Sequence, residues 1–93
     1  MSLDPHRCDE AARQIERAEE LLDATADGSC RHRVEALVGA AAAHGSAEAH
    51  LQHIALPCPN AAVGVGRVSK IELRLKGAER DVLRDCFPAA EGR

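Results

Sequence analysis

The sequence predicts an all-α fold, namely a small antiparallel up-down-up bundle of three to four helices. Two observations favour this class. Apolar residues near both ends of the chain recur at three- and four-residue steps, which is the spacing of an amphipathic helix, and only the short run 71–77 alternates as a strand would. The 93 residues suffice for a single small domain, 1–93, and no internal repeat divides them.

The first helix is expected over about residues 5–27. Asp4 suits the N-cap, Pro5 suits the first helical position, and Gly28 favours termination. Small and apolar residues along this stretch form a seam that would pack against a neighbouring helix. The seam consists of Cys8, Ala11, Ile15, Ala18, Leu22 and Thr25.

The middle of the chain is rich in alanine, and Ser29 can cap a helix there. Its apolar residues share one face as far as the run 44–46, where the apolar phase slips and Gly45 weakens the helix. We therefore expect two helices, about 30–44 and 47–56, or one helix kinked near 44–46. The predicted packing face of the first part consists of Cys30, Val34, Leu37, Val38 and Ala41.

A loop is expected over 57–69, because Pro57 and Pro59 oppose a helix. Ser69 and Glu72 then have the spacing of a capping box, which predicts a last helix over about 70–87. A strand over 71–77 is the alternative, but no second convincing strand exists to pair with it. The expected packing face of the last helix consists of Val68, Ile71, Leu75, Ala78, Val82 and Cys86.

The core of such a bundle is thin. Leu, Ile, Val, Met and Phe together number only 20 of the 93 residues, and alanine contributes little apolar area. Self-association or a protein partner would supply the missing burial. Candidate contact residues lie on the last helix, where ordinary packing within the chain is the equal alternative; they are Leu73, Leu75, Leu83 and Phe87.

Charge and composition exclude several other partners. The net charge of −3 is unlike that of a nucleic-acid binder, and a single Phe with no Trp or Tyr offers no stacking platform for bases. No run approaches the ~20 apolar residues of a membrane span. The polar N-terminus lacks the apolar region of a signal peptide, so the compartment is unknown and the cytoplasm is the default expectation.

The four cysteines have two interpretations. In an up-down-up bundle, Cys8 and Cys58 would lie at one end, whereas Cys30 and Cys86 would lie at the other. Two disulfides with these pairings are compatible with the layout. Without a signal peptide, however, four reduced and buried cysteines are the favoured interpretation.

Metal binding is the sharpest chemical alternative. His50 and His53 lie one helical turn apart, and Cys58 follows after a proline, so these three residues are candidate zinc ligands. The spacing matches no known finger motif, and exposed polar histidines are the more common occurrence. No pattern of nucleophile and base suggests an enzyme, and no cofactor or small-molecule substrate is indicated.

Two functional hypotheses follow from the sequence. The first is a non-enzymatic protein-protein interaction module, acting as an accessory subunit, adaptor or scaffold through an apolar helix seam. The second is a small helical protein that responds to metal or to thiol redox state, using either the histidines with Cys58 or the two cysteine pairs.

Overall fold

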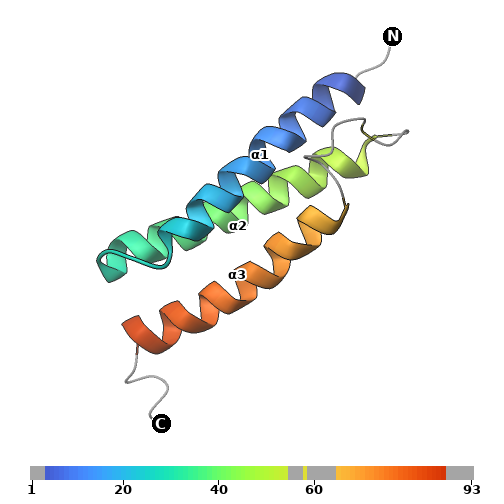
Figure 1. Ribbon diagram of the computed structural model, residues 1–93. Helices are drawn as coiled ribbons and strands as arrows, with labels where there is room; N and C mark the ends of the chain where they lie inside the picture. Colours follow the sequence, from blue (N-terminus) through green and yellow to red (C-terminus); the bar gives the residue numbers. More distant parts are fainter. Residues whose placement is uncertain (1–3, 55–57, 59–64, 88–93) are drawn as a thin grey trace.

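The computed structural model is all-helical and describes residues 4–54, 58 and 65–87 (Figure 1). Its helices are α1 (Asp4–Ala24), α2 (Cys30–Gln52) and α3 (Val65–Cys86). No strand occurs in these described residues, so the run 71–77 is helical and the strand alternative is wrong. The three-helix form of the predicted bundle is therefore the observed one.

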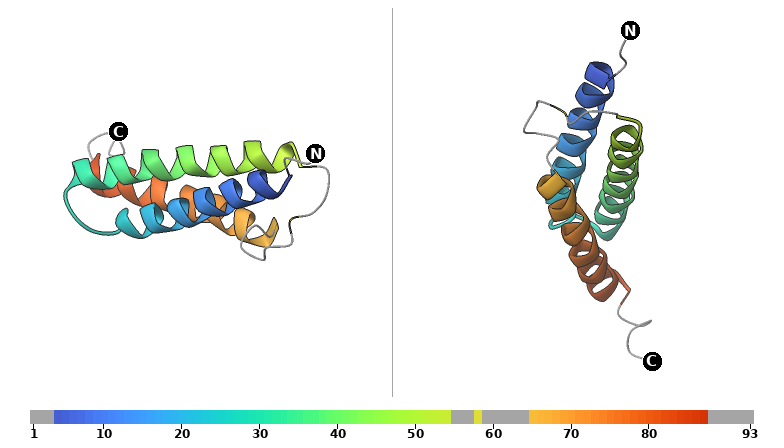
Figure 2. Two further views of the ribbon diagram at one scale, coloured as in Figure 1. Left: turned by 90° about the horizontal axis from the view of Figure 1, so that it is seen from above. Right: turned by 90° about the vertical axis from the view of Figure 1, so that its right-hand side faces the viewer.

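The most extensive contact of the bundle is between α1 and α2, and α3 packs on both more lightly. Figure 1 shows α1 and α2 side by side along most of their length, with α3 on their lower side. Figure 2 shows that α3 diverges from α1 toward its C-terminal end, and α3 has more extensive contact with α2 than with α1. The α2–α3 pair thus has a side that α1 does not cover.

The amphipathic pattern of α1 correctly identified its packing face. All six predicted seam residues are buried, with Ile15 and Ala18 completely inaccessible. The helix ends at Ala24, and the hydroxyl of Thr25 donates a 2.6 Å hydrogen bond to the carbonyl oxygen of Leu22. The following turn uses Gly28 at φ 97°, a conformation that favours glycine.

Helix α2 continues through residues 44–46, so the predicted break into two helices is wrong. A kink within the helix stays a prediction. The physical reason is packing against α1, because Ala43, His44 and Ala47 are all buried on either side of Gly45. The ~1 kcal/mol that a helical glycine costs is smaller than the stabilisation from this contact. Residues 55–57, where a helical end was also predicted, lie outside the described part.

The buried face of α2 is made of four alanines and His44, and not of the larger apolar residues that were predicted to pack. Val38 is 63% exposed and Ala41 is exposed, whereas the accessibility of Ala40 and Ala47 is zero. Small side chains permit close approach of two helix backbones, and Gly39 meets Leu21 of α1 in this way, since a Cβ there would lie 3.0 Å from the leucine Cδ1. The buried set is Ala36, Ala40, Ala43, His44 and Ala47.

Helix α3 begins at Val65, five residues before the predicted start at 70. The capping-box pattern is therefore inside the helix and not at its beginning. Contacts with the rest of the bundle stabilise this first turn, because Val68 packs on the core and Arg67 binds Glu19 of α1. Further along, Ile71 and Val82 are fully buried, as their predicted face requires.

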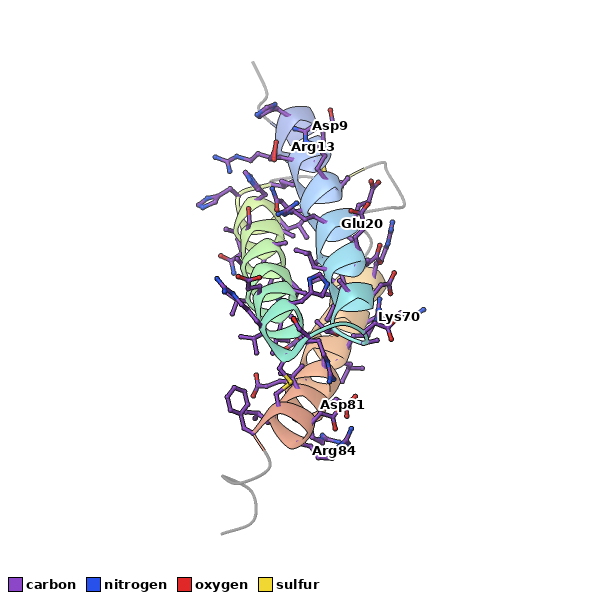
Figure 3. All side chains as sticks on the ribbon, turned by 90° about the vertical axis from the view of Figure 1, so that its left-hand side faces the viewer. Asp9, Arg13, Glu20, Lys70, Asp81 and Arg84 are labelled. Atoms are coloured by element: carbon purple, nitrogen blue, oxygen red, sulfur yellow. A yellow bond between two sulfur atoms is a disulfide. The ribbon has the colours of Figure 1, made fainter. Side chains whose placement is uncertain are left out.

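Ion pairs connect α3 to the other two helices. The guanidinium of Arg67 donates to both carboxylate oxygens of Glu19, at 2.9 and 2.6 Å. This bond lowers the pKa of Glu19 and raises that of Arg67. Arg74 and Asp23 form a second, more exposed pair at 2.8 Å. Most other charged residues, including those labelled in Figure 3, project from the outer surfaces of the helices.

Two disulfides cross-link the chain. Cys8 of α1 is bonded to Cys58, and Cys30, the first residue of α2, is bonded to Cys86, the last residue of α3. The structure holds no free cysteine, so it does not have the reduced state that the sequence favoured. The Cα atoms of the two pairs are 5.7 and 5.6 Å apart, within the range that a disulfide requires.

Candidate functional site

Of the four candidate contact residues near the end of the chain, one is half-buried and three are exposed. Leu75 is half-buried and packs against the core, whereas Leu73, Leu83 and Phe87 are 69%, 45% and 48% exposed. Leu83 lies four residues after Glu79, so the two share one side of α3, and Phe87 directly follows the last residue of the helix. Leu73 faces a different side, because it is two residues from Leu75.

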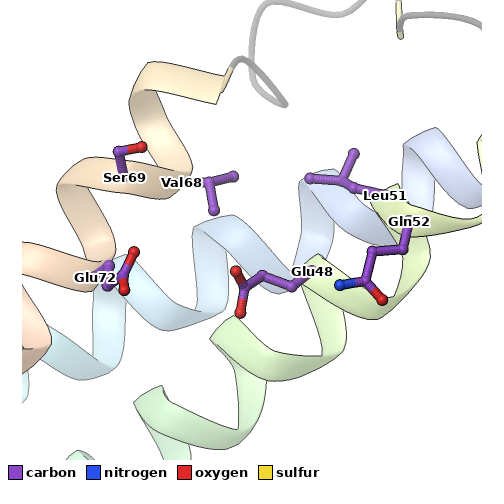
Figure 4. Close-up of a pocket in the computed structure, with 6 residues that line it drawn as sticks. All are labelled: Glu48, Leu51, Gln52, Val68, Ser69 and Glu72. Carbon is purple, nitrogen blue, oxygen red and sulfur yellow. The ribbon is translucent and has the colours of Figure 1, made fainter.

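An open groove runs between α2 and α3 on the side that α1 leaves uncovered. It consists of two adjoining hollows of about 430 and 300 Å³, and Glu72 lines both. Figure 4 shows the smaller hollow, in which side chains of α2 and α3 face each other. The larger hollow is lined by Leu37, Val38, Ala41 and His44 of α2 and by Glu72, Leu75, Lys76 and Glu79 of α3.

The α2 wall of the groove is largely the apolar row that the sequence identified. Leu37, Val38 and Ala41 were expected to pack inside the bundle, but they line an open surface instead. Leu83 lies one helical turn beyond Glu79 on the same side of α3, toward the C-terminal end of the helix. Exposed apolar side chains gathered on one face are typical of protein contact surfaces.

The charged residues of the groove are mostly acidic. The lining residues include three glutamates, Glu48, Glu72 and Glu79, and one lysine, Lys76. Glu48 lies 3.5 Å from Nδ1 of His44, but Glu72, Lys76 and Glu79 form no ion pair among the described residues. Three side chains on one side of α3 are thus available to a charged partner.

His44 lies at the base of the groove and is 9% exposed. Its Nε2 atom is buried without a hydrogen-bond partner in the described part of the chain. A buried polar atom that lacks a partner costs about 1–3 kcal/mol. The alanine-rich sequence of α2 did not indicate that His44 would be buried on its packing face.

Covalent and ionic links fix the two walls of the groove at one end. The Cys30–Cys86 disulfide joins the start of α2 to the end of α3. Beside it, Arg33 of α2 reaches Asp85 of α3 at 3.1 Å and the carbonyl oxygen of Thr25 at 2.7 Å. Hydrogen bonds from Arg84 and then Arg33 lower the pKa of Asp85. The groove is therefore preformed at this end.

The candidate metal ligands do not form a site in the described residues. The sulfur of Cys58 is bonded to Cys8, so it is not a thiolate ligand in this state. His50 has a buried Nδ1 atom without a hydrogen-bond partner, and His53 is exposed at the C-cap of α2. Within 4–54, 58 and 65–87, no three His, Cys, Asp or Glu side chains gather in a way that suits a metal ion.

Sequence reasoning missed the polar half of the groove. Glu72, Lys76 and Glu79 are spaced by four and three residues and Leu83, which was predicted as a contact residue, follows four residues later, so these side chains form a row on α3 beside its buried face. This spacing is visible in the sequence. The sequence does not show, however, that the other helices leave this row uncovered, because its exposure depends on the divergence of α3 from α1.

None of the described helices has the combination of length and apolarity needed to cross a membrane. Comparison of the chain with models of known protein families, with curated proteins and with solved structures finds no significant match to any of them.

Proposed function

We propose that this protein is a non-enzymatic helical interaction module, acting as an accessory subunit, adaptor or scaffold, and that it binds protein through the groove between α2 and α3. The observation that carries the proposal is the exposure of Val38, which lines this groove, together with that of Leu83 and Phe87 toward the C-terminal end of α3. Large apolar side chains on the surface of so small a domain are stabilised when a partner covers them.

The preformed geometry of the groove supports the same function. A disulfide and the Arg33–Asp85 pair hold its walls, so little conformational entropy would be lost on binding. We further propose that the three helices run up, down and up in an antiparallel bundle. In this arrangement the two walls of the groove, α2 and α3, run along the same length. Of the expected contact residues, Leu75 lines the groove, Leu83 lies one helical turn beyond Glu79 on the same side of α3, and Leu73 lies on another side.

Two matched variants test the proposal. Leu83→Glu places a charge on the groove wall, whereas Leu73→Glu places the same charge on another side of α3. We expect the wild-type chain and Leu73→Glu to associate, with themselves or with a protein captured from a native lysate, and Leu83→Glu to lose the association while it stays folded by circular dichroism. Equal binding by both variants would refute the groove as the docking surface.

A thiol-redox response is a second candidate, and the Cys30–Cys86 disulfide favours it because this bond joins the two groove walls. Reduction would release the end of α3 and alter the groove. Titration with thiol buffers of defined potential, followed by alkylation and intact mass, measures the midpoint of this bond. A midpoint far below that of cellular glutathione would identify the disulfide as structural.

A further inference from the structure

We propose that the occupant of the α2–α3 groove is a second copy of this chain, in a two-fold dimer held by reciprocal contacts between Lys76 and the partner's Glu79. The inference rests on the proposed function, since it names the partner of the same groove. Two features carry it, namely the apolar rim of the groove and the self-complementary order of charges on its α3 wall.

The order of charges on α3 is complementary to that of a second α3 helix that runs in the opposite direction. Lys76 and Glu79 lie three residues apart on the groove side and carry opposite charges, and neither has an ion-pair partner among the described residues. When two copies of one helix pack in opposite directions across a two-fold axis, each residue before the axis meets one after it. An axis between these residues therefore brings each lysine against a glutamate of the other chain, twice.

The α2 wall fits the same axis. The larger hollow joins Val38 and Ala41 of α2 to Lys76 and Glu79 of α3, so these residues lie at the same level of the groove. An axis at this level would bring Val38, which is 63% exposed, against the α2 wall of the other chain. The apolar side chain of Val38 would thereby be removed from water in both chains, which stabilises the dimer.

The other two-fold arrangement is disfavoured by charge. An axis parallel to the helices would lay α3 on the partner's α2. Lys76 would then meet a wall formed by Leu37, Val38 and Ala41, which offers no carboxylate, and Glu72 would approach the partner's Glu48. Like charges placed together in an interface oppose association. The arrangement with α3 on α3 is the one that brings Lys76 against a carboxylate, that of Glu79.

Charge reversal tests the inference. In Lys76→Glu or Glu79→Lys alone, both contacts across the axis become repulsive, so we expect the dissociation constant to rise at least about tenfold. The double variant restores opposite charges and is expected to dimerise like the wild type. Lys70→Glu, an exposed lysine of α3 that does not line the groove, is the matched control and should leave dimerisation unchanged.

Mixing the two single variants separates a contact between chains from a contact within one helix. A chain with Lys76→Glu and a chain with Glu79→Lys carry complementary charges only toward each other, so their mixture is expected to form a heterodimer. Sedimentation equilibrium on the disulfide-bonded chains, with circular dichroism to check folding, measures all six samples, namely the wild type, the four variants and the mixture.

Two results would overturn the inference. A wild-type chain that stays monomeric at about 100 µM shows that a second copy does not fill the groove. A dimer that neither the double variant nor the mixture restores shows that another surface is used. The proposed function fails separately, when Leu83→Glu binds its protein partner as well as Leu73→Glu does.

Discussion

Cys30 and Cys86 are bonded to each other, and this disulfide joins the first residue of α2 to the last residue of α3. The bond crosses one end of the groove, where Arg33 and Asp85 also pair. Helix α3 has the lighter contacts with the rest of the bundle. The disulfide therefore fixes the helix that packing alone holds least firmly.

Removal of this disulfide is expected to destabilise the protein. A cross-link between residues 56 apart contributes about 4 kcal/mol by the chain-entropy model, and measured values are often nearer 2. We expect Cys30→Ser/Cys86→Ser to lower the free energy of unfolding by about 2–4 kcal/mol in urea titrations. The comparison variant, Cys8→Ser/Cys58→Ser, should cost a similar amount but weaken dimerisation less. An unchanged urea midpoint in both would contradict these roles.

Gly77→Ala is expected to stabilise the chain by about 0.5–1 kcal/mol. A Cβ at Gly77 meets no atom within 4 Å, so alanine gains helix propensity without a steric cost. Gly28→Ala is the contrasting variant, because Gly28 has φ 97° and a Cβ there would lie 2.9 Å from a ring carbon of His32. Thermal melts should move up for the first and down for the second.

Ala40→Leu is expected to destabilise the α1–α2 contact by about 1–3 kcal/mol, because Ala40 is fully buried against the core cluster and a larger side chain forces the helices apart. Ala42→Leu is the matched control on the exposed side of α2. Its free energy of unfolding should change by less than about 0.5 kcal/mol. Equal losses in the two variants would mean that close approach of the helices is not what stabilises this pair.

Stability should decline in acid partly through Glu19. The bond from Arg67 holds the pKa of Glu19 below its ordinary 4.5, so this carboxylate stabilises the fold above that pH. The contribution is lost as pH falls from 4.5 toward the lower folded value. Glu19→Gln should therefore reduce the free energy of unfolding by about 1 kcal/mol at neutral pH and by less in acid. A constant difference across this range would exclude the linkage.

The predictability of each helix follows from the size of its buried side chains. The buried seam of α1 contains Ile15 and Leu22 among smaller residues, so the three- and four-residue steps identify its face. The buried face of α2 is alanine, and alanine also occurs on its exposed sides, so the pattern carries little information about phase. Val38 and its neighbours were for this reason assigned to the wrong contact.

The cysteine pairings followed from topology, whereas their oxidation state did not. The two pairs predicted to share an end of the bundle are those that the structure joins. The reduced state was favoured because no signal peptide was recognised, and disulfides are characteristic of oxidising compartments. The early start of α3 was missed for a different reason, since Gly66 indicated a loop while contacts of Arg67 and Val68 with the bundle stabilise a helix.

Methyl NMR of the chain at rising concentration tests the central claim most directly. If a second copy covers the groove, the methyl signals of Val38, Leu75 and Leu83 shift together with concentration, and those of Leu73 and the buried Leu22 do not. The shifts should disappear in Lys76→Glu and return in its mixture with Glu79→Lys. Groove signals that stay constant from about 10 to 200 µM, or shifts confined to Leu73, would contradict the dimer.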